Sequence, residues 1–278
     1  MFTLGILGLG YLGQQVQARG SWSVQSWAVG AHQVKQPNAD PLPFDWADPK
    51  TWDNLPCQAD GLLLCIPPVF GNLSQERLHL ESWGAWMNLN RPDIRRLVYL
   101  STTGVYANEP ELFDESSATV PKGIRGQLRL LSEQVLSQYF DLKVIRSGAI
   151  YGPGRSIEQR LLQGDPIPSD SGLVHRIHVI DLANICTLAL VQPGFPAIVN
   201  GVDPNPASSL EVAQWVVRQP GYQKLKLNQE AGYLARKGFG SVPGRTIKSQ
   251  QLEALEYLFT YPSYQDSLTQ GGVNESVH

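Results

Sequence analysis

The sequence predicts an α/β fold with a doubly wound parallel sheet, and three observations support this expectation. The chain opens on a short apolar run, residues 2–7, which leads directly into a glycine-rich segment at 8–13. Further apolar runs of strand length, such as 96–101, alternate with longer segments of helical periodicity. The run at 60–66 is almost continuously apolar, which is typical of a strand buried on both faces of a parallel sheet.

The glycine-rich segment has the pattern G-x-G-x-x-G between a predicted strand and a predicted helix. In this context the first Gly permits a tight turn, the second lets backbone approach a pyrophosphate, and the third lets the helix pack closely on the strand. The helix N-terminus adds free N–H groups and the positive end of its dipole. The segment therefore predicts a Rossmann dinucleotide-binding loop, with a glycine-rich turn that binds no ligand as the alternative. The predicted contacts are Gly8, Gly10, Tyr11, Leu12 and Gly13.

The other elements of the predicted domain follow in chain order. Apolar runs predict strands at 23–29, 41–45, 60–66, 96–101, 141–146 and 197–201. Amphipathic spacing predicts helices at 11–20, 47–55, 73–89, 122–139 and 181–190, with Asp181 as the N-cap of the last of these. A capping box at 208–211 and a final helix through Leu252 and Leu255 complete the pattern, and residues 270–278 are expected to fray.

The segment after the second strand bears on the choice between NAD and NADP. A NAD-binding unit carries an acidic residue about 20 residues after the glycines, where it binds the ribose hydroxyls. Residues 29–35 contain no acid, whereas His32 and Lys35 are able to meet a 2′-phosphate. The sequence therefore favours NADP, with ordinary loop roles for both residues as the alternative.

Ligands of open α/β sheets bind at the carboxyl ends of the strands. The apolar run at 60–66 stops at Pro67-Pro68, because proline cannot continue a central strand. Hydroxyl side chains cluster after the run at 96–101, and a Gly/Pro-rich stretch follows the one at 141–146. The cofactor contacts predicted at these strand ends are Asp45, Ile66, Pro67, Pro68, Ser101, Ser147, Gly148, Ala149 and Ile150.

Composition narrows the class of protein. The chain has 278 residues, 42% of them hydrophobic and 17% charged, with a formal net charge of −3. It has no basic run, which argues against nucleic acid or an anionic membrane surface as partner. No apolar stretch approaches the roughly 18 residues of a membrane span, and no signal peptide is apparent. The three widely spaced cysteines argue against a disulfide framework or a metal site, so we expect a cytoplasmic protein.

Four segments together resemble the extended short-chain dehydrogenase/reductase superfamily, of the NAD-dependent epimerase/dehydratase type. They are the glycine loop, 100–106, 146–154 and 176–182, in matching order and spacing. The resemblance covers the first two-thirds of the chain. It implies a Rossmann domain at 1–155, completed by about 179–203, and a small α+β substrate-binding region at 156–178 and 204–278.

Two departures from the family pattern bear on the chemistry. Members carry a Tyr-x-x-x-Lys pair on the helix after the Ser/Thr-rich strand, where the Tyr is the acid/base. Counting back from Glu133, these positions are Arg125 and Arg129, so the triad with Thr102 lacks its proton donor because arginine stays protonated. The chain also has G-x-G-x-x-G where extended members have G-x-x-G-x-x-G. Both departures resemble the atypical subgroup that lacks the active-site Tyr.

The remaining candidates concern acid/base work and the substrate. Tyr106 and Tyr151 follow strand ends and, together with His175, are candidate replacements for the missing Tyr, with the capping of turns as the alternative role. The family places residues like Arg176 near a substrate phosphate, which implies a small anionic or nucleotide-sugar-like substrate. Arg155, His175 and Arg245 are the other predicted substrate contacts.

Two functional hypotheses follow from these residues. The first is an NAD(P)-dependent epimerase-like or reductase-like protein with an altered active site. The second is a non-catalytic NADP(H)-binding sensor or regulatory protein, suggested by the missing Tyr and Lys. The sequence names neither the substrate nor the oligomeric state.

Overall fold

The computed structural model describes residues 1–36, 39–170, 172–232 and 245–271. The chain forms two compact units, which we describe separately. Unit 1 comprises Met1–Tyr106, Thr119–Arg146 and Leu182–Val199, and unit 2 comprises Ala107–Ala118, Ser147–Asp181 and Asn200–His278.

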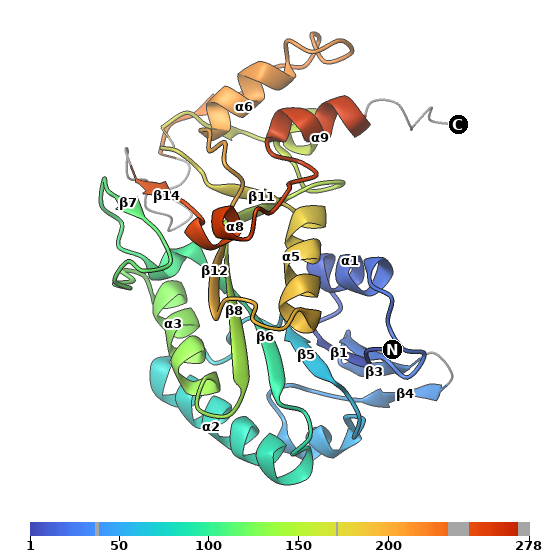
Figure 1. The fold of residues 1–278 in the computed structure, drawn as a ribbon. Helices are drawn as coiled ribbons and strands as arrows, with labels where there is room; N and C mark the ends of the chain where they lie inside the picture. The colour runs from blue at the N-terminus through green and yellow to red at the C-terminus, as the bar shows by residue number, and fades with distance from the viewer. Residues whose placement is uncertain (37–38, 171, 233–244, 272–278) are drawn as a thin grey trace. The chain divides into compact units, whose positions relative to one another are not determined.

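Unit 1 is built on a sheet of eight strands in the order β12-β8-β6-β5-β1-β2-β3-β4 (Figure 1). The pairs β1/β2, β1/β5 and β5/β6 are parallel. The strands are β1 (Leu4–Leu7), β2 (Trp27–Gly30), β3 (Gln33–Gln36), β4 (Ala39–Pro43), β5 (Gly61–Leu64), β6 (Arg96–Thr102), β8 (Asp141–Ser147) and β12 (Ile198–Gly201).

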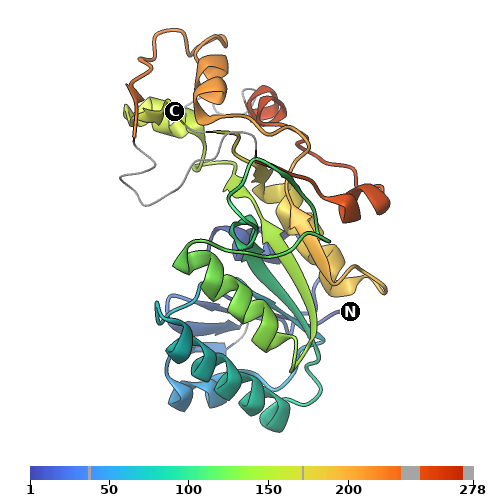
Figure 2. The ribbon, with the colours of Figure 1, turned by 90° about the vertical axis from the view of Figure 1, so that its left-hand side faces the viewer.

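Helices cover both faces of this sheet. The helices α2 (Leu73–Asn90) and α3 (Ile124–Leu136) lie side by side over one face (Figures 1 and 2). The opposite face packs against α1 (Tyr11–Arg19) and α5 (Val179–Val191). Gly13 of α1 lies against Ile6 of β1, and Leu190 of α5 lies against Gly61 of β5. The doubly wound α/β fold expected from the sequence is confirmed.

The sheet departs from the expected parallel pattern at one edge. Strand β3 pairs antiparallel with both β2 and β4, so the segment expected as a loop at 29–35 is part of a hairpin. Its two-residue turn places Ala31 and His32 at φ 50° and 62°, as in a type I′ hairpin turn. Such turns favour Asn-Gly, and this turn lacks that signal, which is why the hairpin was not predicted.

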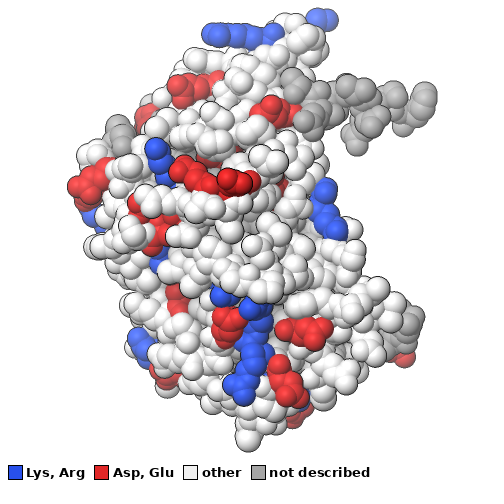
Figure 3. Space-filling view, in the orientation of Figure 1, with Lys and Arg blue, Asp and Glu red and all other residues white. Residues whose placement is uncertain are grey.

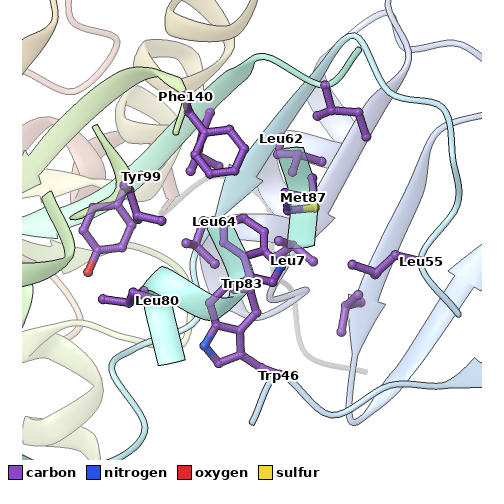
Figure 4. Packing of buried hydrophobic residues seen from close by; sticks show 14 of the residues in the cluster. Leu7, Trp46, Leu55, Leu62, Leu64, Leu80, Trp83, Met87, Tyr99 and Phe140 are labelled. Atoms are coloured by element: carbon purple, nitrogen blue, oxygen red, sulfur yellow. The ribbon is translucent and has the colours of Figure 1, made fainter. Parts of the chain in front are cut away.

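The core under α2 and α3 is rich in tryptophan (Figure 4). The Trp83 ring lies 4.7 Å from that of Trp46 and 5.2 Å from that of Phe140. Leu62 and Leu64 of β5 project into this cluster, as expected for a strand with apolar residues on both faces. Trp83 and Met87 therefore belong to the core, as the helical spacing of 73–89 indicates.

Several predicted elements differ in extent or type. The strand expected at 23–29 begins only at Trp27, and the helix expected at 47–55 is a 3₁₀-helix, η1 (Pro49–Asn54). Asp181 is not the N-cap of α5, which begins at Val179. Its buried carboxylate instead accepts hydrogen bonds from the Thr260 and Tyr261 N–H groups at 2.7 and 2.9 Å.

Unit 2 contains short strands and helices around a smaller core. Three pairs of strands are parallel: β9 (Ala149–Tyr151) with β11 (Arg176–His178), β10 (Ile167–Pro168) with β13 (Gln229–Glu230), and β7 (Leu112–Phe113) with β14 (Thr246–Ile247). The helices are α4 (Ile157–Gln163), α6 (Ser209–Val216), α8 (Gln250–Ala254) and α9 (Tyr264–Gly271). The expected capping box is confirmed, because Ser208 and Glu211 exchange hydrogen bonds at the start of α6.

The described residues contain no helix long and apolar enough to cross a membrane. Within the same residues, no group of three or more His, Cys, Asp or Glu side chains is arranged to hold a metal ion. The face drawn in Figure 3 carries small, separate groups of basic and acidic side chains.

Candidate functional site

The order of the strands fixes where a ligand of unit 1 would bind. The chain runs from β1 outward to β2 and later returns to β5 on the other side of β1, so the winding reverses between β1 and β5. Ligands of open α/β sheets bind at such a reversal, outside the carboxyl ends of the strands. The glycine loop follows β1 and residues 65–68 follow β5, so both lie at this point.

The glycine loop has the geometry that a dinucleotide requires. Gly8 has φ 107°, a left-handed conformation that glycine adopts freely. A Cβ on Gly13 would overlap the Gly8 carbonyl oxygen, so α1 packs closely only because that Cβ is absent. A Cβ on Gly10 would meet no atom within 4 Å, so open space lies over the second glycine at the start of α1. The loop therefore fits a pyrophosphate held by the helix N-terminus.

The β2–β3 hairpin lies beside this loop. The Leu9 N–H donates to the Val29 carbonyl at 2.6 Å, and a Cβ on Gly30 would lie 3.1 Å from that of Leu9. His32 and Lys35 are both exposed, with His32 in the turn at the carboxyl end of β2. The structure thus places His32 at the carboxyl end of β2, in the hairpin that packs against the glycine loop.

The segment after β5 forms the other wall of the crevice. A Cβ on Gly8 would lie 3.1 Å from the Ile66 nitrogen, so this segment packs directly against the glycine loop. The Glu76 carboxylate, only 1% exposed, accepts the Val69 and Phe70 N–H groups at 3.0 Å each. This clamp ties the segment containing Pro67 and Pro68 to the first turn of α2.

Asp45 follows β4 and Phe44, whose N–H donates to the His32 carbonyl at 2.9 Å, so it lies next to the turn of the β2–β3 hairpin. Its carboxylate accepts the Ala47 N–H at 2.9 Å, and its charge acts on His79 of α2. Burial lowers the pKa of His79 to about 4, so this imidazole is neutral at physiological pH.

The carboxyl end of β6 holds the Ser/Thr cluster. Thr102 is half-buried, and its hydroxyl oxygen accepts the Gly104 N–H at 3.1 Å at the start of a 3₁₀ turn, η2 (Thr103–Val105). A Cβ on Gly126 would overlap the Gly104 carbonyl, so the first turn of α3 lies against this turn. The structure therefore brings the α3 segment that carries Arg125 next to the cluster that carries Thr102.

The two arginines at the Tyr and Lys positions have different surroundings. Arg125 is exposed in the first turn of α3. Arg129 is half-buried, and it donates to the Leu100 carbonyl at 2.7 Å and to the Tyr99 hydroxyl at 3.1 Å. Its charge acts on Cys65, at the end of β5, although burial dominates and raises the pKa of that thiol to about 12. Arg129 therefore lies between the carboxyl ends of β5 and β6.

Glu133, the residue from which the triad positions are counted, forms a buried ion pair. Arg146 donates to its carboxylate at 2.7 Å, and the two side chains are 5% and 6% exposed. The Ser101 hydroxyl also donates to Glu133, while the Tyr106 hydroxyl accepts from Arg146 at 3.0 Å. The structure thus assigns Ser101 and Tyr106 to a buried network within unit 1, in which the Tyr106 side chain is 1% exposed.

The predicted residues Ser147–Ile150 belong to unit 2, and so do the four predicted substrate contacts. His175 accepts the Ile247 N–H at its Nε2 at 2.9 Å, and burial lowers its pKa to about 4, so it holds β14 as a neutral side chain. The Arg245 guanidinium lies 5.9 Å from the centre of the Phe113 ring. Neither residue lines the cavity described next, whereas Arg155 and Arg176 do.

Unit 2 contains a cavity of about 1090 Å³. Its lining includes β9, β11, α4, α6 and α9, and it also includes three tyrosines outside the strands: Tyr222, Tyr261 and Tyr264. Three arginines, at 155, 160 and 176, outnumber the single carboxylate, Glu158, in this lining. Neither the helices α4 and α9 nor these tyrosines could be predicted, because short helices and single aromatic residues carry no spacing signal.

Asp203 is a buried carboxyl close to this cavity, 2% exposed. Burial raises its pKa to about 7, with Asp181 and Asp266 adding to the shift and the Asn205 N–H and Arg176 opposing it. Folded Asp203 therefore keeps its proton up to about pH 7, whereas an unfolded aspartate loses it near pH 4. Its contribution to stability falls as pH rises through this window.

We expect Asp203→Asn to remove this pH dependence, because an amide does not titrate. The amide oxygen can still accept the Asn205 N–H. The melting temperature of the variant, relative to the wild type, should rise by a few degrees between pH 5 and pH 8. The neutral His79 and His175 give the opposite slope, but they are common to both proteins and cancel in the difference. A difference that stays constant across this range would contradict the assignment.

Comparisons with known proteins find the same α/β fold in solved structures. No protein-family model matches the sequence. The chain is 25% identical over 190 residues to the epimerase family protein SDR39U1 homolog, chloroplastic, of Arabidopsis thaliana, a match that spans 64% of this chain and about half, 54%, of that protein.

Solved structures are similar over nearly the whole chain. A conserved protein of unknown function from Silicibacter pomeroyi aligns with a TM-score of 0.76 at 23% identity, over 98% of this chain and 99% of that one. Human epimerase family protein SDR39U1 (isoform 2), solved with NADPH, aligns with a TM-score of 0.73 at 18% identity, over 98% and 100%. With its glycine loop and doubly wound sheet, the chain has the Rossmann-like α/β fold of these structures, and it is similar in sequence to an epimerase family protein over 190 residues.

Proposed function

We propose that unit 1 binds NADP(H) in the crevice between β1 and β5, and that the protein is an epimerase-like or reductase-like member of the short-chain dehydrogenase/reductase superfamily with an altered active site. The observation that carries this proposal is the glycine loop, where space is open over Gly10 and closed at Gly13. The NADPH bound to the human relative supports the choice of cofactor.

We propose further that Arg129 and Thr102 act on the reacting end of the cofactor and substrate. When bound, the nicotinamide supplies hydride transfer. Thr102 offers its hydroxyl to a substrate oxygen, and the Arg129 guanidinium stabilises negative charge that develops there. Neither arginine releases a proton at neutral pH, so the proton must come from the substrate, from water or from a group that is still to be identified.

The substrate proposed for this protein is a small anionic molecule of the nucleotide-sugar kind. The excess of arginine in the lining of the unit 2 cavity supports an anion, and its volume of about 1090 Å³ is ample for a ligand of that size. Arg155 and Arg176 are the proposed contacts.

The three cysteines form no disulfide among themselves, which supports a reducing compartment such as the cytoplasm.

A non-catalytic NADP(H) sensor is the second candidate, and one observation favours it. Arg129 is anchored to the Leu100 carbonyl and the Tyr99 hydroxyl, and no tyrosine stands four residues before it whose pKa it could lower, as the lysine of the Tyr-x-x-x-Lys pair does. Turnover separates the candidates: net oxidation of NADPH (a reductase) or conversion of a nucleotide sugar into its epimer without net oxidation supports the enzyme, whereas tight binding of NADPH with neither result across such a panel supports the sensor.

We expect NADPH to bind at least about tenfold more tightly than NADH, because His32 and Lys35 are exposed near the expected ribose position and no acid follows β2. Fluorescence titration of the reduced cofactors measures both affinities. The double variant His32→Ala, Lys35→Ala should remove most of the difference. A wild-type preference for NADH would overturn the proposed role of the hairpin.

A further inference from the structure

Two buried polar side chains in the lining of the unit 2 cavity have hydrogen-bond donors that the described residues leave unused. Strands β9 and β11 form part of this lining, with Ala149 opposite Arg176 and Tyr151 opposite His178. Paired residues of parallel strands project from the same face, and all four of these residues line the cavity. Tyr151 and Arg176 are each 7% exposed.

The first of these donors is the hydroxyl of Tyr151. It is buried and has no hydrogen-bond partner within the described part of the chain. Burial and the neighbouring Asp203 raise the pKa of this phenol above its usual value, so it stays protonated and able to donate. A buried hydroxyl without a partner is unfavourable, so a ligand that accepts its hydrogen bond gains affinity.

The second is the guanidinium of Arg176. It donates to the Val174 and Ala207 carbonyls and to the Ser209 hydroxyl, all of them neutral oxygens. In the ranges that the structure describes, no carboxylate forms an ion pair with it, and burial lowers its pKa to about 10. A guanidinium has five N–H donors, so two remain for a ligand.

This inference rests on the proposed function, which assigns the unit 2 cavity to the substrate, and it adds one residue of the lining that selects the substrate. We propose that Tyr151 is a specificity-determining residue, whose hydroxyl and the remaining Arg176 donors together bind the oxyanion of an organic acid or phosphate. A carboxylate and a phosphate share this chemistry, with several acceptor oxygens on one centre.

Tyr222 is a matched control for Tyr151, because it lines the same cavity and its hydroxyl already donates to Glu158. We expect Tyr151→Phe to weaken oxyanion binding about tenfold or more, the range for a hydrogen bond to a charged group, and Tyr222→Phe to change it much less. Calorimetric titrations with succinate and with inorganic pyrophosphate measure this and separate carboxylate from phosphate recognition.

The melting temperature gives a readout that does not depend on the ligand. If the Tyr151 hydroxyl makes no hydrogen bond until a ligand binds, Tyr151→Phe should leave the ligand-free protein as stable as the wild type or more stable. A loss of several degrees would show a structural partner, such as a buried water, and would overturn the proposal.

Anion binding at the glycine loop is controlled with Gly10→Val, in which the cavity is intact. Probe binding that disappears in Gly10→Val, binding that is equal in wild type and Tyr151→Phe, or no binding up to about 10 mM would each overturn the proposal. NADPH titration is scored separately, so failure of cofactor binding and failure at Tyr151 give different results.

Discussion

Replacing Gly10 with valine should weaken NADPH binding by about two orders of magnitude or more, while the fold of unit 1 is retained. The backbone of Gly10 is in an extended conformation, φ −93°, that valine adopts, and its Cβ would meet no protein atom within 4 Å. The side chain would instead fill the space in which a pyrophosphate approaches the N-terminus of α1. Fluorescence titration of NADPH measures the effect, and the melting temperature reports the fold.

Gly123 offers a matched control for this variant. It is the N-cap of α3, has φ −103°, and a Cβ there would also meet nothing within 4 Å. Gly123→Val should therefore carry the same cost of placing valine at a helix N-cap without blocking the crevice. Equal NADPH affinities in both variants would refute the cofactor site.

The largest effect on stability is expected from Glu133→Ala. The substitution leaves Arg146 buried, 5% exposed, with the Tyr106 hydroxyl as its remaining hydrogen-bond partner among those described. Removing one partner of a buried ion pair costs about 3–5 kcal/mol, because the other charge stays desolvated. For a protein of this size the melting temperature should fall by roughly 10 °C.

The pair Arg96–Asp141 is the control for this prediction. Its atoms are 2.9 Å apart, but the side chains are 24% and 45% exposed, so water screens their attraction. Asp141→Asn should cost less than about 1 kcal/mol. A double variant, Glu133→Leu with Arg146→Met, should recover much of the stability lost in Glu133→Ala, because no charge is then buried. If Glu133→Ala melted like Asp141→Asn, the network would have no special role.

The predictions that succeeded are those with a local physical cause. The glycine loop, the apolar strand at 61–64 and the capping box at 208–211 follow from residues that are neighbours in sequence. The hairpin at 27–36 was missed, because Ala31 and His32 adopt left-handed conformations that their types disfavour. Asp181 was misplaced, because its carboxylate binds backbone N–H groups about 80 residues away.

The sequence by itself determined that this chain has a glycine-rich segment with the dinucleotide-binding pattern between a strand and a helix, and that it lacks the usual Tyr-x-x-x-Lys pair. Both conclusions depend on residue types at short, fixed spacings. Only the tertiary structure decided that Arg129 is anchored at the end of β6, and that Tyr151 and Arg176 line one cavity. Burial and hydrogen bonds depend on residues far apart in the chain, and no local pattern encodes them.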